Sequence, residues 1–212
     1  MRFLMVFCAG AILFASSVCA ADRQPGAAVS KAPAKKSPIG VEGAERASVS
    51  QFGGNACYLY DSYTVISRAA RGSVGSDTLV KAGGQGSKTS CKWEESGALL
   101  LIRNRDAEYF FGISGSFLFI DSGTGTDART FMVYDLGKKK KVFSSPYSGV
   151  PVISGNALLF WIPSGAASKA GCPDYDTWTA SGLSVVKESE VRLDLLSLEH
   201  APTGRSRCSA RQ

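Results

Sequence analysis

The chain has 212 residues, of which 44% are hydrophobic and 20% charged, and its formal net charge is +6. A chain of this length can bury a core within one domain without a stabilising metal or a partner copy. After residue 20 no apolar stretch is long enough for a membrane span, so we expect a mature protein that does not span a membrane.

Residues 1–20 have the layout of a secretory signal peptide. Arg2 is followed by an uncharged apolar run over residues 3–15, and small residues then lead to Val18-Cys19-Ala20. The alternatives are a membrane anchor or an ordinary N-terminal helix, but the run is short for a bilayer. We expect cleavage after Ala20 and export to the periplasm or the medium. The mature chain would keep 23 Lys and Arg against 18 Asp and Glu, a net charge of +5.

Residues 21–50 are dominated by Ala, Pro, Ser, Lys and Gly, lack aromatic residues and show no apolar periodicity. Such a segment cannot bury enough surface to offset the entropy of ordering it. We therefore expect a flexible linker over residues 21–50 and one folded domain over residues 51–212.

Four cysteines remain after the expected cleavage: Cys57, Cys91, Cys172 and Cys208. In an oxidising compartment they predict a disulfide framework. We favour Cys57–Cys91 and Cys172–Cys208, because each closes a loop of similar, moderate length, while the other two pairings stay open. A zinc site would require closely spaced cysteine pairs, which the mature chain lacks.

Frequent glycines and short apolar runs separated by turn residues predict an all-β domain. We expect a single antiparallel β-sandwich or barrel-like domain, with a small propeller-like β-meander as the alternative. Residues 129–136 carry apolar groups on both faces and predict a central strand, and residues 173–180 predict one short helix. The expected strands cover Leu59–Ile66, Thr78–Lys81, Thr89–Trp93, Ala98–Arg103, Glu108–Ile113, Ser116–Ile120, Arg129–Leu136, Lys141–Ser144, Ala157–Ile162, Leu183–Lys187, Glu190–Glu199 and Arg205–Ser209.

The sharpest local motif is the run LFIDSGTG over residues 118–125, which resembles the aspartic-protease signature. In that family two such aspartates share a proton and activate water, and the resemblance would give this role to Asp121. The chain has no second Asp-Ser/Thr-Gly element, so we interpret residues 121–127, DSGTGTD, as a hairpin loop that joins two core strands. Calcium binding by Asp121 and Asp127 is not expected, because glycines occupy the intervening ligand positions.

Two further candidates lie outside this run. Asp174, Tyr175, Asp176 and Trp178 follow Cys172 and could bind a sugar, but a disulfide-pinned loop is the simpler interpretation. His200 is the single histidine of the chain, and no nucleophile elbow accompanies it.

We therefore predict no catalytic, cofactor or metal site, and an exported non-enzymatic domain that binds a cell-envelope component or a protein partner. The lysine run over residues 138–141 and the basic net charge suit an anionic envelope polymer, whereas nucleic acid is not expected. One alternative is a carboxylate-based hydrolase, aspartic-protease-like or glycosidase-like, that uses Asp121, Asp127, Asp174 or Asp176. Another is a secreted enzyme inhibitor.

Overall fold

The structure is a computed structural model that describes residues 36–37, 40–84, 91–125 and 129–211. All of them belong to one compact unit, residues 33–212. The predicted signal peptide, most of the predicted linker and Asp127 lie outside the described residues. Within the described part of the chain, no helix has the length and apolar character needed to cross a bilayer.

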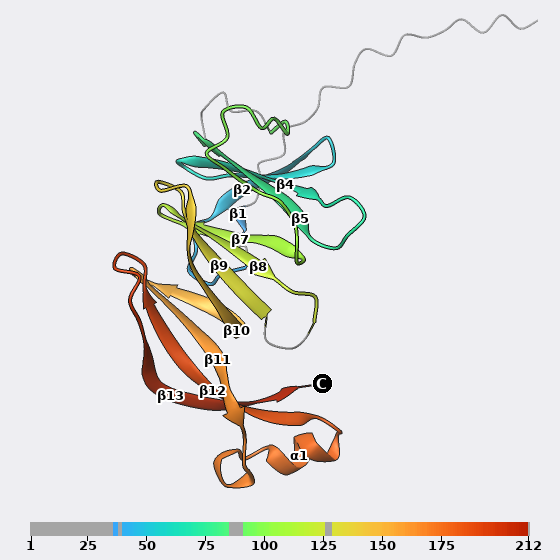
Figure 1. Cartoon of the computed structure of the whole chain (residues 1–212), viewed down its shortest axis with the longest axis vertical. Coiled ribbons are helices and arrows are strands. Elements are labelled where there is room, and N and C mark those ends of the chain that lie inside the picture. Colours follow the sequence, from blue (N-terminus) through green and yellow to red (C-terminus); the bar gives the residue numbers. More distant parts are fainter. Residues whose placement is uncertain (1–35, 38–39, 85–90, 126–128, 212) are drawn as a thin grey trace, which may run out of the picture. The chain divides into compact units, whose positions relative to one another are not determined.

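The first sheet has six antiparallel strands in sequence order (Figure 1). They are β1 Lys36–Ser37, β2 Ala47–Phe52, β3 Asn55–Leu59, β4 Tyr63–Ala69, β5 Ser76–Ala82 and β6 Leu100–Ile102. The strand expected over Thr89–Trp93 is wrong for its described part, because residues 91–93 have an irregular backbone.

The second sheet has seven antiparallel strands, again paired in sequence order. They are β7 Glu108–Ser114, β8 Phe117–Ser122, β9 Arg129–Asp135, β10 Lys140–Ser154, β11 Ala157–Ala166, β12 Ser184–Asp194 and β13 His200–Arg211. Between β11 and β12 lie the 3₁₀ turn Lys169–Gly171 and the short helix α1 Tyr175–Ala180. The predicted all-β fold with antiparallel sheets is confirmed.

The long strand β10 joins two halves of the second sheet. Residues 140–147 pair with β9, whereas residues 148–154 pair with β11, and the register shifts between Ser148 and Val152. Such irregularities bend a strand and increase its twist. The sheet can therefore fold back on itself at β10.

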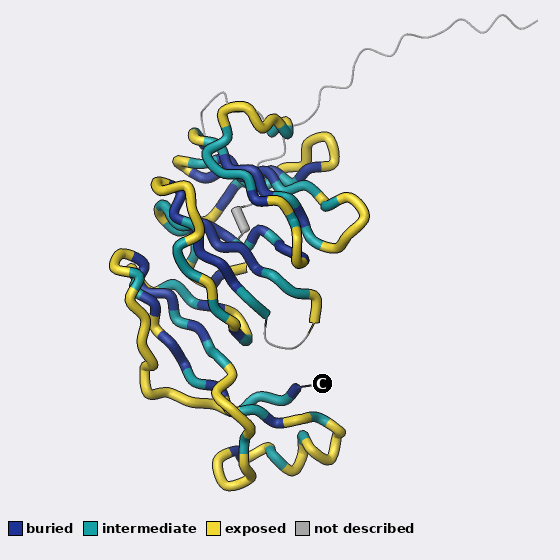
Figure 2. Tube along the Cα trace, viewed as in Figure 1, coloured by how far each residue is buried: buried dark blue, intermediate teal, exposed yellow. Residues whose placement is uncertain are grey.

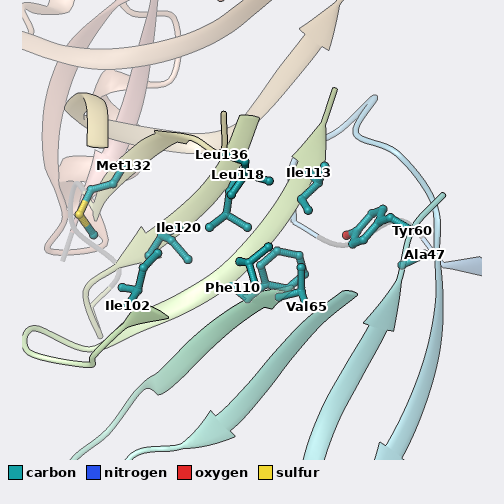
Figure 3. Close-up of a cluster of buried hydrophobic side chains, with 11 residues drawn as sticks. Ala47, Tyr60, Val65, Ile102, Phe110, Ile113, Leu118, Ile120, Met132 and Leu136 are labelled. Carbon is teal, nitrogen blue, oxygen red and sulfur yellow. The ribbon is translucent and has the colours of Figure 1, made fainter. Parts of the chain in front are cut away.

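Two apolar clusters lie on either side of β8 and β9. Both strands are largely buried (Figure 2). The first cluster joins Val65 and Val80 of the six-stranded sheet to residues of β7, β8 and β9 (Figure 3). The second joins Phe119 and Phe131 to side chains of β11 and β12. Because Phe131 belongs to one cluster and its neighbour Met132 to the other, β9 is buried on both faces, as its sequence predicts.

The predicted linker boundary at residue 50 is wrong. Val41 is 1% exposed, and its N–H donates to the carbonyl of Phe111 in β7 at 3.2 Å. The N–H of Glu42 donates to Pro151 of β10 at 2.9 Å, and β2 begins at Ala47. These backbone hydrogen bonds and the buried side chains of Val41 and Ala47 attach the segment to the second sheet and the core. Its overall composition suggests no such contact.

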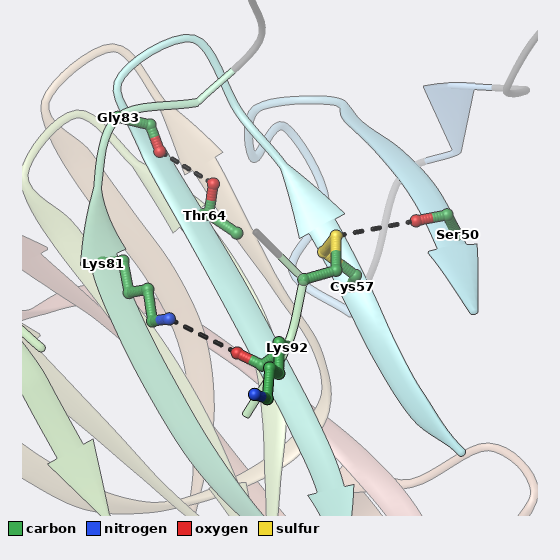
Figure 4. The surroundings of a disulfide bond; sticks show 7 residues. Ser50, Cys57, Thr64, Lys81, Gly83 and Lys92 are labelled. Atoms are coloured by element: carbon green, nitrogen blue, oxygen red, sulfur yellow. Dashed lines mark hydrogen bonds between the residues drawn. A yellow bond between two sulfur atoms is a disulfide. The ribbon is translucent and has the colours of Figure 1, made fainter. Parts of the chain in front are cut away.

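The structure forms both disulfides in the pairing that the sequence favours. Cys57 lies in β3 and bonds to Cys91 (Figure 4). Cys57 belongs to a small apolar cluster of the first sheet with Ile66 and Leu79. Cys172 bonds to Cys208 of β13 and ties the segment before α1 to that strand.

Candidate functional site

The glycine-rich sequence around Asp121 suggests a loop. In the structure, however, Asp121 lies in β8, with 6% of its surface exposed. Its carboxylate accepts hydrogen bonds from Nε of Arg129 at 2.9 Å and from Nη2 of the same guanidinium. The hydroxyl of Tyr147 donates to Oδ1 at 2.8 Å. The predicted loop therefore begins two residues too early: β8 continues through Asp121, which pairs with Phe131 of β9, and the backbone leaves the strand only after Ser122.

The carboxylate of Asp121 is held by donors from two neighbouring strands, Arg129 of β9 and Tyr147 of β10. The hydrogen bond and charge of Asp121 raise the pKa of Arg129, and burial together with Asp121 raises the pKa of Tyr147. A guanidinium and a neutral phenol therefore both donate to this carboxylate, the pattern of a charge-assisted pair.

A second carboxylate lies on β12. The side chain of Glu188 is fully shielded from solvent and accepts hydrogen bonds from Nε of Arg207 at 2.7 Å, Oγ of Ser209 at 2.6 Å and Nη2 of Arg211 at 2.7 Å. Burial by itself would raise the pKa of Glu188, but hydrogen bonds from these three residues and Ser148 hold it below its usual value. Glu188 is therefore an anion at neutral pH.

Residues that bind Asp121 and residues that bind Glu188 line the same surface hollow, which has a volume of about 330 Å³. We call it the arginine hollow. Its charged and hydroxyl-bearing lining residues are Arg129, Tyr147, Ser148, Glu188, Arg207, Ser209 and Arg211. Arg129 is the first residue of β9 and Arg211 is the last residue of β13. The lining also includes Ser148 and Gly149, so the hollow lies at the bend of β10.

Gly149 allows the guanidinium of Arg207 to approach the bend of β10. Its φ of +68° favours glycine, and a Cβ at this position would lie 3.0 Å from Nη2 of Arg207. A larger residue would strain the backbone and crowd the arginine.

Arg207 is also held by an aromatic ring. Its guanidinium carbon lies 4.5 Å from the ring centre of Trp161 in β11, and that of Arg205 lies 5.9 Å from the same ring. Arg205 in turn pairs with Glu190 of β12. Cation–π contacts of this kind restrict the arginine side chain and leave its charge intact.

The arginine hollow has the chemistry of an oxyanion site. Three guanidiniums face two carboxylates, which leaves an excess of positive charge, and each guanidinium presents five N–H donors in a planar fork. Ser209 donates its hydroxyl proton to Glu188, so the donors left for a ligand belong to the guanidiniums. Glu188 is ionised and saturated with donors, so it is poorly suited to deliver a proton.

The other predicted candidates do not line this hollow. Asp174 and Asp176 are exposed, and Asp176 pairs with Lys169 at 2.5 Å on the surface. His200 begins β13 as an exposed residue whose ring centre lies 5.3 Å from that of Phe143. In the described ranges no three His, Cys, Asp or Glu side chains are grouped closely enough to hold a metal ion.

The residues that build the hollow were missed because each is ordinary in its local sequence. Glu188-Ser-Glu190 and Arg205-Ser-Arg207 each place like charges two residues apart, hence on one face of a strand. If these two segments had been predicted to be neighbouring strands, their alternating charges would have predicted ion pairs between the strands. The pairing Glu188 with Arg207 is the one the structure shows.

The chain matches no known protein family, and neither a curated protein nor a solved structure is significantly similar to it.

Proposed function

We propose that the protein is an exported, non-enzymatic binding domain that recognises anionic groups of a cell-envelope component through the arginine hollow. The observation that carries this proposal is the convergence of Arg129, Arg207 and Arg211 on one open hollow. Arg129 and Arg207 are partly exposed, at 30% and 40% of their side chains, so a ligand can reach them.

Buried carboxylates make these arginines better receptors. Asp121 and Glu188 orient the guanidinium planes before a ligand arrives, so less side-chain entropy is lost on binding. The remaining N–H donors suit the planar or tetrahedral oxygens of carboxylate and phosphate groups. The basic net charge supports the same ligand class by attracting polyanions at long range.

A carboxylate-based hydrolase receives less support from this geometry. A general acid needs a carboxyl group whose pKa is raised towards neutrality, whereas that of Glu188 is lowered. Asp121 is engaged by Arg129 and Tyr147. Both acidic groups thus act as anchors for cations in this proposal.

Equilibrium binding tests the proposal with the mature chain and three immobilised polymers: polygalacturonate, polyphosphate and neutral dextran. We expect both polyanions to bind at low salt, weaker binding at high salt, and no binding to dextran, because charge recognition is screened by salt. Purified peptidoglycan serves as the envelope sample. Absence of binding to both polyanions at low salt would refute the proposal.

A further inference from the structure

A second hollow, of about 590 Å³, lies beside β6, β9 and the first half of β10. It shares no lining residue with the arginine hollow. β6 has three residues, and the turn over residues 103–107 follows it directly. The outer part of β9, from Thr130 to Tyr134, therefore lines open space at the end of the first apolar cluster.

The lining of this hollow is apolar in part. Leu101 and Ile102 of β6 and Met132 of β9 contribute side chains, and Ile102 and Met132 belong to the first apolar cluster. Met132 is an adaptable side chain that accommodates ligands of varied shape. Ligand sites commonly combine such a surface with a few placed polar groups.

Positive charge is available at the same hollow. Arg105 and Lys141 are exposed and line it, and neither has a carboxylate within 4.0 Å among the described residues. Arg103 also lines it but is already paired with Asp77 at 3.2 Å and Glu95 at 2.5 Å.

Two carboxylates stand against these cations. Glu108 is buried, and its Oε2 accepts the backbone N–H groups of Arg105 at 2.6 Å and Asp106 at 2.7 Å. Asp106 is exposed and lines the hollow. Glu108 and Asp106 offset part of the positive charge, but Oε2 of Glu108 is bonded to the backbone, so the N–H donors of Arg105 and Lys141 stay available to a ligand.

The hydroxyl of Tyr134 adds a hydrogen-bond donor whose present acceptor is weak. In the described part of the chain its hydrogen-bond partner is the thioether sulfur of Met132 at 3.9 Å, which is a weak acceptor. Burial, then the charge of Glu108, raises the pKa of Tyr134, so the phenol stays protonated at neutral pH. It can therefore donate to a ligand oxygen.

We infer that this second hollow binds a small amphiphilic anion, whose apolar body contacts Met132 and whose anionic head group meets Arg105 and Lys141. The Tyr134 hydroxyl donates to the same head group. This site is independent of the proposed envelope-binding function.

The probe is 8-anilinonaphthalene-1-sulfonate, an apolar anion that fluoresces when shielded from water. We expect saturable binding to the mature protein, displacement by decanoate below its micelle concentration, and far weaker displacement by decanol or sodium sulfate. The Arg105→Gln/Lys141→Gln variant should bind about tenfold more weakly, because two charge contacts are lost. Ser144→Trp, which fills the hollow from β10, should abolish binding.

The matched control is Arg71→Gln/Lys139→Gln, which removes the same charge from exposed positions outside the hollow and should leave the affinity unchanged. Circular dichroism verifies that each variant is folded. Equal displacement by decanol and decanoate would overturn the inference, as would displacement by sulfate alone or the absence of saturable binding. Binding that survives Ser144→Trp, or that is lost in Arg207→Gln, would also overturn it.

Discussion

Nη2 of Arg211 lies 2.7 Å from Oε1 of Glu188, although the two residues are 23 positions apart in the sequence. Their side chains are 9% and 0% exposed. This ion pair fastens the last residue of β13 to the interior of β12. The same arginine nitrogen donates to Oγ of Ser148 at 2.5 Å, so the pair also reaches the bend of β10. The arginine hollow is built around this contact.

Replacing Glu188 with glutamine should destabilise the fold. The substitution keeps the size of the side chain but leaves Arg207 and Arg211 without their buried counter-charge, which costs on the order of 3 kcal/mol. Urea unfolding measures the loss. Lys187→Gln, at an exposed neighbouring position, should change the unfolding free energy by less than about 0.5 kcal/mol. A loss below about 1 kcal/mol for Glu188→Gln would show that the network does not stabilise the fold.

Stability should fall in acid. Burial would raise the pKa of Glu188 and Glu190, but hydrogen bonds from arginine and hydroxyl groups outweigh it and lower both. A carboxyl whose pKa is lower in the folded state stabilises above its unfolded pKa of about 4.3, and this contribution disappears as the pH falls through the folded value. We expect the unfolding free energy to decrease from about pH 5 downwards.

The Glu190→Gln variant should lose part of that pH dependence, whereas Glu199→Gln, an exposed residue, should retain it. Denaturant titrations between pH 2 and 7 give the unfolding free energy at each pH, and hence the slope of that free energy against pH. Identical slopes for the wild type and Glu190→Gln would contradict the assignment.

The two disulfides should differ in their effect on binding. Cys208 lies between Arg207 and Ser209, both of which donate to Glu188, whereas Cys57 lies in the other sheet. Cys172→Ala/Cys208→Ala and Cys57→Ala/Cys91→Ala should each lower stability by about 2–4 kcal/mol. Polyanion affinity should fall in the first variant alone. Equal affinities in the two variants would mean that the Cys172–Cys208 bond does not position the hollow.

Export predicts a defined N-terminus. The mature protein recovered from the periplasm or the medium should begin at Ala21, since the small residues before it fit the signal-peptidase site. Intact-mass spectrometry measures this directly. A product that retains residues 1–20 would contradict export by cleavage.

Alternating side chains were sufficient to predict much of the fold. Residues 129–136 carry apolar groups on both faces, and β9 does separate two clusters. The segment from Gly40 to Ala47 was missed because its attachment depends on backbone hydrogen bonds to β7 and β10, which composition does not encode. Local sequence could predict these strands because their burial follows their own periodicity.

The arginine hollow depends on contacts between distant strands. The glycines that follow Asp121 mark it as a candidate in the sequence. Its partner Tyr147, however, lies 26 residues away and is not marked by any local motif. Glu188 and Arg207 could be joined only once the pairing of β12 with β13 was known. A single sequence contains the alternation of charge in both strands but not their register.

The most direct test of the central claim compares Arg207→Gln with Arg192→Gln. Both arginines belong to the face of the second sheet that carries Glu188, and their side chains are 40% and 52% exposed, but only Arg207 lines the arginine hollow. Each substitution removes one positive charge. The measurement is the Kd for polygalacturonate or polyphosphate at low salt, with unfolding curves to verify that both variants are folded.

We predict that Arg207→Gln weakens polyanion binding by roughly tenfold or more, because charge-assisted hydrogen bonds are lost. Arg192→Gln should weaken it less than about twofold, the change expected from net charge at long range. Equal losses in the two variants would contradict the proposal, since binding would then follow the overall charge of the protein and not the arginine hollow.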